Sequence, residues 1–148
     1  MQHALPDLRI TGGINADDGF WEGLADGEFR MPRCATCRRW RWPANWRCSE
    51  CGGWDQEWVT LEPMGSVYSW TRSWLAFDRT GTRAGDVPYV VVLAEISAAG
   101  GARVLGVLGG DEAGLAIGAP VRGVVLAPSA KSLGYPSLQW VLADGKGD

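Results

Sequence analysis

The stretch RCATCRRWRWPANWRCSECGG, residues 33–53, holds all four cysteines of the 148-residue chain. They form two Cys-x-x-Cys pairs that ten residues separate, at Cys34, Cys37, Cys48 and Cys51. The two thiolates of each pair can converge on one ion, and a short hairpin between the pairs brings all four to the same ion. The spacing therefore predicts a zinc ribbon. Iron is the less favoured metal, because rubredoxin-like iron sites use similar ligands but nothing else in the chain indicates electron transfer.

Four thiolates close the coordination shell of the predicted metal. A closed tetrahedral site is structural, whereas a catalytic zinc keeps one position open for water. The one histidine, His3, lies far from the cysteines in the sequence, so it offers no general base and no partner for a serine nucleophile. Asp17 with Asp18, and Asp111 with Glu112, are adjacent pairs in loop or cap contexts and are expected to be solvated. The sequence predicts no catalytic residue.

The overall composition is that of a soluble globular protein rather than a nucleic-acid or membrane protein. The formal net charge is −3, although proteins that wrap nucleic acid usually carry a basic balance. The longest apolar run is far too short to span a bilayer, and the first residues lack the apolar core of a signal peptide. We therefore expect a cytoplasmic protein, in which paired cysteines bind metal rather than form disulfides.

The order of the predicted elements indicates a mainly β protein with three parts. Residues 1–16 are expected to be a flexible arm, and residues 17–54 a short helix, which Asp17 or Asp18 caps, followed by a rubredoxin-like zinc ribbon. Residues 55–148 begin with a strand at 55–61 that leaves the ribbon. Alternating or apolar runs then predict five strands at residues 65–77, 88–96, 102–108, 120–126 and 137–142. Five strands around one core, with glycines at the bends, predict an OB-fold barrel, with a β-sandwich as the alternative.

Arginine and tryptophan are concentrated around the cysteines. Six arginines and no acidic residue lie within residues 30–47, and five of the nine tryptophans lie within residues 40–58. Two interpretations of the arginines stay open: they donate to the thiolates and backbone around the metal, or they bind phosphate groups. The tryptophans favour a protein interface, because a lobe of about twenty residues has little room to bury them. The candidate contact residues are Arg38, Arg39, Trp40, Arg41, Trp42 and Trp46.

The chain resembles the zinc-ribbon plus OB-fold family of acyl-CoA-associated proteins, formerly a domain family of unknown function. The resemblance covers nearly the whole chain from Asp18. Four segments carry it in the order known for the family: FWEGLADGEFRMPRCATCRRWRWPANWRCSECGG, EWVTLEPMGSVYSWT, VPYVVVLAEI and IGAPVRGVV. Any one segment is weak, but their combination is specific.

The resemblance implies a non-catalytic partner subunit with a structural zinc. Such proteins pair with thiolase-fold enzymes, including thiolases, acyltransferases and aldolases of steroid side-chain degradation, or with hot-dog-fold hydratases that act on acyl-CoA. The partner supplies the catalytic groups, and this subunit would stabilise the hetero-oligomer and help to bind the CoA thioester.

A binding module for single-stranded nucleic acid is the alternative function. OB folds bind such strands with aromatic platforms and basic grooves, and Tyr68, Trp70, Trp74 and Tyr89 are suitable platforms. The charge argues against this alternative, because residues 55–148 contain seven basic and ten acidic residues. A free-standing enzyme or redox protein is the least favoured possibility.

Overall fold

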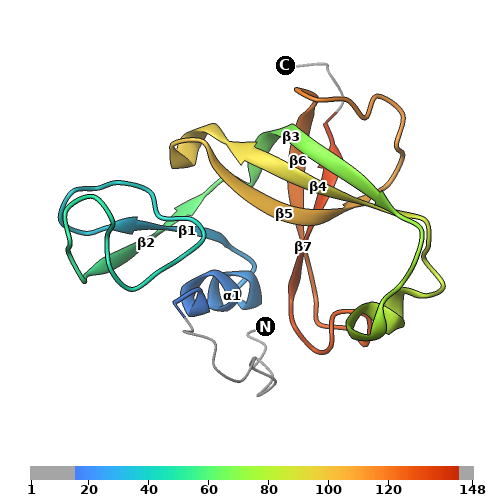
Figure 1. Ribbon diagram of the computed structural model, residues 1–148, viewed down its shortest axis with the longest axis horizontal. Helices are drawn as coiled ribbons and strands as arrows, with labels where there is room; N and C mark the ends of the chain where they lie inside the picture. The colour runs from blue at the N-terminus through green and yellow to red at the C-terminus, as the bar shows by residue number, and fades with distance from the viewer. Residues whose placement is uncertain (1–15, 144–148) are drawn as a thin grey trace.

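The computed structural model describes residues 16–143, without the side chains of residues 78–80. Helix α1 (Asp18–Ala25) is followed by a hairpin of two antiparallel strands, β1 (Phe29–Cys34) and β2 (Gln56–Leu61). The long connection between these strands contains the ribbon loops (Figure 1). The predicted strand at 55–61 is thus confirmed as β2, and its partner is β1. The predicted arm lies outside the described residues, except for Ala16, which is buried.

Five further strands close into a barrel in the order β3-β4-β5-β7-β6. This closure confirms the OB fold and shows that the β-sandwich alternative is wrong. All neighbouring strands are antiparallel except β5 and β7, which run parallel. The strands are β3 (Met64–Ser73), β4 (Tyr89–Ile96), β5 (Ala102–Gly109), β6 (Pro120–Leu126) and β7 (Ser137–Leu142).

The barrel differs from the predicted strands in two respects. Strand β3 ends at Ser73 instead of residue 77, and residues 78–86, whose turn-forming composition predicts a loop, contain a short 3-10 helix, η1 (Asp78–Arg83). The apolar run at 88–96 predicts a strand buried on both faces, but the residues of β4 alternate between buried and half-buried positions. The reason is that a closed barrel has a single interior, so only every second residue of a strand can point into it.

Trp140 occupies the interior of the barrel and is fully buried. Its indole Nε1 donates a hydrogen bond to the carbonyl of Val104 at 3.2 Å, which satisfies the polar end of the ring. The ring of Phe29, from β1, lies edge-on to it with 6.3 Å between the ring centroids. The core of the barrel therefore continues into the hairpin that holds the ribbon.

Aromatic side chains also join α1 and the ribbon loops to this core. Phe20 of α1 lies 6.2 Å from Phe29 and 4.7 Å from Trp42 of the ribbon, measured between ring centroids. The predicted cap is only partly right, because Asp17 occupies the N-cap position without a side-chain bond to the helix backbone. Its carboxylate instead accepts a hydrogen bond from Trp21 Nε1 at 3.0 Å. The helix, ribbon and barrel thus share one hydrophobic core.

Candidate metal centre

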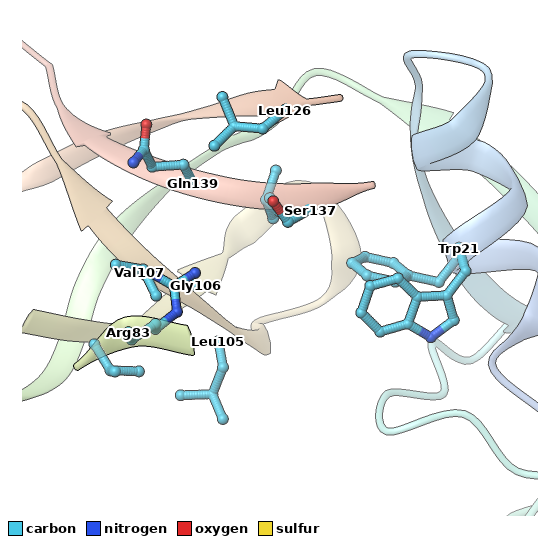
Figure 2. A pocket seen from close by; sticks show the side chains of 11 residues that line it. Trp21, Arg83, Leu105, Gly106, Val107, Leu126, Ser137 and Gln139 are labelled. Carbon is cyan, nitrogen blue, oxygen red and sulfur yellow. The ribbon is translucent and has the colours of Figure 1, made fainter. Parts of the chain in front are cut away.

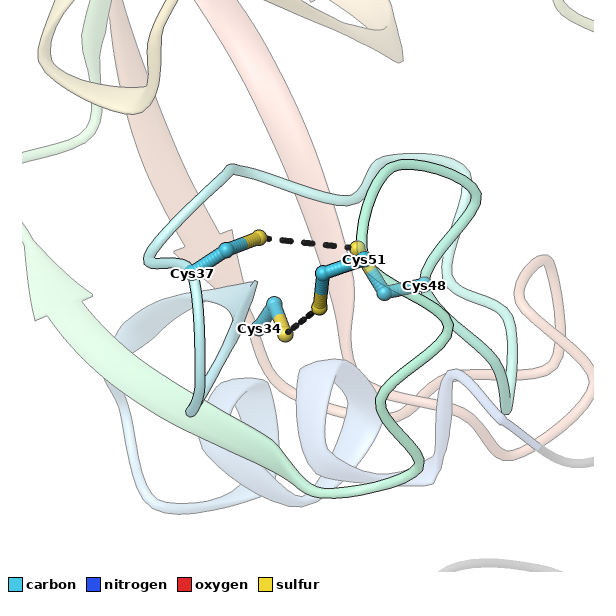
Figure 3. Close-up of side chains that lie close together, drawn as sticks. All are labelled: Cys34, Cys37, Cys48 and Cys51. Carbon is cyan, nitrogen blue, oxygen red and sulfur yellow. Dashed lines mark hydrogen bonds between the residues drawn. The ribbon is translucent and has the colours of Figure 1, made fainter.

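The four cysteine sulfurs gather at the end of the β1–β2 hairpin (Figure 3). All four Sγ atoms lie within 4.8 Å of one another, with Cys34 and Cys51 3.6 Å apart and Cys37 and Cys48 3.7 Å apart. A tetrahedral zinc with Zn–S bonds of about 2.3 Å places its sulfurs about 3.8 Å apart. The four thiols therefore fit a zinc ion in both ligand type and spacing. Within residues 16–143 no other group of three or more potential ligands comes together.

The two Cys-x-x-Cys loops have the same backbone construction. The amide of Arg38 donates to the carbonyl of Cys34 at 2.9 Å, and the amide of Gly52 donates to the carbonyl of Cys48 at 3.0 Å. Arg38 and Gly52 both have a positive φ, of 66° and 74°. A positive φ suits glycine and costs free energy for any residue with a Cβ. Arg38 therefore adopts an unfavourable backbone conformation in this loop.

Backbone amides favour the thiolate form of two ligands. The N–H groups of Cys37 and Thr36 lower the pKa of Cys34 from 9.0 to about 6, although burial opposes this shift. The N–H groups of Cys51 and Glu50 likewise lower the pKa of Cys48. At Cys37 the N–H of Arg39 lowers the pKa, but burial and the neighbouring thiols outweigh it and raise the pKa to about 11. A bound cation would offset the burial and the neighbouring thiols that raise the pKa of Cys37, and would favour its thiolate form.

Acidic residues outside the 30–47 segment pair with its arginines. Glu57 of β2 lies opposite Arg33 of β1 in the strand register and accepts hydrogen bonds from both Arg33 and Arg38, the latter at 2.7 Å. These guanidinium groups hold the pKa of Glu57 below its ordinary value. Arg30 binds Asp26 and Glu28, each at 2.8 Å. The sequence analysis missed these partners because it counted charges within residues 30–47 only. The pairing of β1 with β2 places Glu57 next to Arg33.

The six predicted contact residues differ in burial: the three consecutive residues 40–42 are buried or half-buried, and the other three are exposed. Arg41 is 5% exposed and donates to the side chain and backbone carbonyl of Asn45. Trp40 and Trp42 are half-buried and pack against the core. Arg38, Arg39 and Trp46 are exposed. Arg38, Arg39 and Trp46 therefore offer a partner the most accessible surface, and the contact role of all six residues remains a prediction.

Three of the four predicted platform residues have a guanidinium group near one face of the ring. Arg103 lies 3.7 Å from the ring centroid of Tyr68, Arg72 lies 5.9 Å from that of Trp70, and Arg83 lies 5.7 Å from that of Tyr89. Each of these cation–π contacts covers one face of its ring, so a nucleobase could stack only on the opposite face. Sequence reasoning missed the exposure of four apolar side chains on the barrel and its loops, at Leu75, Leu105, Ile117 and Leu133.

Known proteins similar to this chain share both its parts. Two family models match it: the rubredoxin-like zinc ribbon domain of ChsH2 over residues 21–55, and the C-terminal OB-fold domain of ChsH2 over residues 58–126. A probable enoyl-CoA hydratase alpha subunit from Thermomonospora curvata is 33% identical over 91 residues. The aligned region is 61% of this chain but only 27% of that relative, so the chain spans about a quarter of the relative's length.

Two solved structures have the same fold. A chain described as Ltp2-ChsH2(DUF35) aldolase superimposes with a TM-score of 0.72 at 24% identity, covering 94% of this chain and 99% of that one. A DUF35 protein of unknown function from Sulfolobus solfataricus gives a TM-score of 0.56 at 18% identity, covering 89% and 88%. In the part of the chain that the structure describes, no helix is long and apolar enough to cross a membrane.

The matched domains and the sulfur geometry agree on the metal. The first domain is a zinc ribbon by family, and its four cysteines stand at the spacing that zinc requires, which confirms the predicted structural zinc. The matches also cover the ribbon and most of the barrel. The chain therefore belongs to the family of ChsH2-type proteins, which join a rubredoxin-like zinc ribbon to a C-terminal OB-fold domain.

Proposed function

We propose that this protein is a non-catalytic accessory subunit of an enzyme that processes acyl-CoA thioesters. The observation that carries the proposal is the closed four-cysteine site: it fits a structural zinc and leaves no position for a reacting water or substrate. The one histidine and the adjacent acidic pairs supply no catalytic constellation. The reacting groups therefore come from a partner, and this chain contributes a folded surface.

The similar proteins support an acyl-CoA context. One relative is described as a probable hydratase subunit for enoyl-CoA, and one structural neighbour as an aldolase of ChsH2 with Ltp2. We therefore propose a thiolase-fold enzyme as the partner, with a hydratase-like enzyme as the second choice. The acyl substrate is a lipid or steroid side chain carried on CoA.

The exposed aromatic side chains support a surface that a partner covers. Trp54 is 67% exposed in the ribbon, and Trp74 is 72% exposed after β3. Exposed tryptophans of this kind are enriched at protein interfaces and lower the solubility of an isolated subunit. Arg38 and Arg39, beside the zinc site, are the proposed contacts for carboxylates of the partner or phosphates of CoA.

Co-expression with a thiolase-fold enzyme, which the proposal expects to be encoded beside this gene, tests the proposal. We expect the two chains to purify together and this chain to be more soluble than when made alone. Cys34→Ser removes a metal ligand and should abolish co-purification, whereas Ser49→Ala, an exposed change between Cys48 and Cys51 of the second ribbon loop, should not. A chain that remains a soluble monomer, ignores the enzyme and binds single-stranded oligonucleotides with a steep salt dependence would contradict the proposal.

A further inference from the structure

The ribbon lobe contains a charged side chain that is closed off from water. Arg41 is 5% exposed, and among the side chains described in residues 16–143 it is the single buried polar or charged one. Its backbone N–H donates to the carbonyl of Pro32 in β1 at 2.9 Å. Its neighbours Trp40 and Trp42 pack against the hydrophobic core. The position of Arg41 is therefore set by the hairpin and the core.

Asn45 satisfies only part of the Arg41 guanidinium. Nε and Nη2 both donate to Asn45 Oδ1, at 3.2 Å and 2.5 Å, and Nη2 also donates to the backbone carbonyl of Asn45. Nη1 is buried and has no hydrogen-bond partner. A guanidinium carries five N–H groups, so the two on Nη1 are left unpaired. Buried donors without a partner are rare in folded proteins because they cost free energy.

The described chain supplies no counter-charge to Arg41. Its guanidinium has neither a carboxylate nor a cysteine sulfur within bonding distance in residues 16–143. The five other arginines of the 30–47 segment are either within 4.0 Å of a carboxylate, at Arg30, Arg33, Arg38 and Arg39, or exposed, at Arg47. An arginine keeps its charge when it is buried, and a buried charge without an opposite charge is strongly destabilising. Arg41 therefore requires an anion from outside the chain.

The unpaired N–H groups decide which anion fits. A carboxylate or a phosphate pairs with arginine through two parallel N–H groups on neighbouring nitrogens. Asn45 already occupies Nε and Nη2, so this arrangement is not open to a ligand. The two N–H groups of Nη1 diverge from a single nitrogen. They suit a spherical, monatomic anion better than an oxyanion.

The surroundings of Nη1 also favour a small ligand. Because Nη1 is buried, a side chain of another protein does not reach it in this arrangement. The cavity between β5, β7 and α1 (Figure 2) does not have Arg41 among its lining residues, so the ion would lie within the ribbon lobe. Residues 41–47 form no helix or strand. A small displacement of this loop is enough to admit a monatomic ion.

We propose that Arg41 binds an inorganic anion of the halide class, such as chloride, as a counter-ion inside the ribbon lobe. The N–H groups of Nη1 donate to the anion, while Asn45 holds the guanidinium from its other side. The bound ion stabilises the lobe. The inference goes beyond the proposed accessory role and does not depend on it, because it concerns this chain alone.

Thermal unfolding of the full-length, zinc-loaded protein tests the inference in sodium chloride and in sodium gluconate of equal ionic strength. Gluconate is too bulky for the site, so the Tm should be about 3–6 °C higher in chloride. Salts also act on the whole protein surface, and variants separate that effect. Arg41→Met should lose the chloride response, whereas Arg39→Met, at an exposed arginine, should keep it. Equal Tm values of the wild type in both salts, or an unchanged response in Arg41→Met, would overturn the inference.

A carboxylate placed beside Arg41 should replace the ion. Asn45→Asp keeps the oxygen that accepts from the guanidinium and adds a negative charge next to it. The variant should have a higher Tm than the wild type in gluconate and little response to chloride. Ser49→Asp adds the same charge at an exposed position of the ribbon and should keep the response. A full chloride response in Asn45→Asp would contradict the inference.

Crystals of the wild-type protein locate the ion without a variant that has to fold. A crystal grown in sodium bromide should show an anomalous-scattering peak in contact with Arg41 Nη1. A water molecule at this position, or no peak, would overturn the inference. Co-purification with an enzyme bears only on the accessory role, so the inference and the proposed function can fail separately.

Discussion

Trp40 of the ribbon lies directly against Gly100 at the turn between β4 and β5, so closely that a Cβ on Gly100 would stand 2.7 Å from the indole Cδ1. The backbone of Gly100 has a positive φ of 64°, which also favours glycine. The zinc ribbon thus packs against the barrel through the contact between Trp40 and Gly100. Because Trp40 also lies 5.5 Å from the guanidinium of Arg33, the contact connects β1, the ribbon and the barrel.

Gly100→Ala should destabilise the protein more than Gly101→Ala. Both glycines have a positive φ, but nothing lies within 4 Å of a Cβ built on Gly101. Gly101→Ala therefore measures the backbone cost alone, about 1–2 kcal/mol. Gly100→Ala adds the clash with Trp40, about 1–3 kcal/mol more in an overpacked site. Urea unfolding of the two variants measures these costs. An equal decrease in the free energy of unfolding in both variants would show that Trp40 does not pack closely against Gly100.

Removal of the metal should unfold the ribbon and loosen the barrel. The purified protein should contain about one zinc per chain, and Cys34→Ser or a strong chelator should remove it. The free energy of unfolding should fall by several kcal/mol, because zinc binding supplies much of the folding free energy of such lobes. Metal analysis and thermal unfolding measure both effects. A protein that keeps its metal-loaded Tm after complete removal of zinc would contradict the structural role.

The pairing of Glu57 with Arg33 and Arg38 should make part of the stability depend on pH. The pKa of Glu57 in the folded state lies below its ordinary value of 4.5, because the two guanidinium groups favour the carboxylate. A lowered folded-state pKa stabilises the protein above the unfolded pKa, and this contribution disappears as the pH falls through the folded pKa.

Glu57→Gln should accordingly destabilise the protein at neutral pH and have a diminishing effect as the pH falls below about 4. Glu62→Gln, on the exposed turn after β2, is the control. Urea unfolding of wild type and both variants between neutral and acidic pH measures the difference. A deficit of Glu57→Gln that stays constant across this range would show that the ion pairs do not carry the effect.

Trp140→Phe should destabilise the barrel by about 2–4 kcal/mol. The change removes the hydrogen bond from Nε1 to the Val104 carbonyl and leaves a cavity in a fully buried position. Trp54→Phe, at a position 67% exposed, should change the stability by less than about 0.5 kcal/mol. Chemical unfolding monitored by circular dichroism compares the two, and similar effects at both positions would contradict the central place of Trp140.

Local sequence patterns predicted the metal site and most of the barrel. The four ligands of the ribbon lie within eighteen residues of one another, so their spacing alone indicates the site. The strands at 120–126 and 137–142 have the predicted bounds, because turn residues flank both apolar runs. Contacts that depend on strand pairing could not be read in this way. The pairing of Glu57 with Arg33, for example, requires the register of β1 and β2.

The burial of Arg41 and Trp42 also lay beyond local patterns. A dense run of arginine and tryptophan is compatible with a displayed surface and with a packed lobe; the sequence favoured an interface for the tryptophans and left the role of the arginines open. The structure buries Arg41 against Asn45 and packs Trp42 against Phe20, because α1 lies beside the ribbon and supplies apolar surface that the lobe lacks. The position of α1, which local sequence patterns do not give, decides whether Trp42 is packed or displayed.

The central claim is that this chain supports catalysis without performing it, and acyl-CoA turnover measured on three samples tests it most directly. The samples are the chain alone, the thiolase-fold enzyme alone and the purified complex, each loaded with zinc. We predict no turnover by the chain, low activity or poor stability of the enzyme alone, and full activity of the complex. Turnover of acyl-CoA by the chain alone would contradict the account, because this chain would then carry catalytic groups of its own.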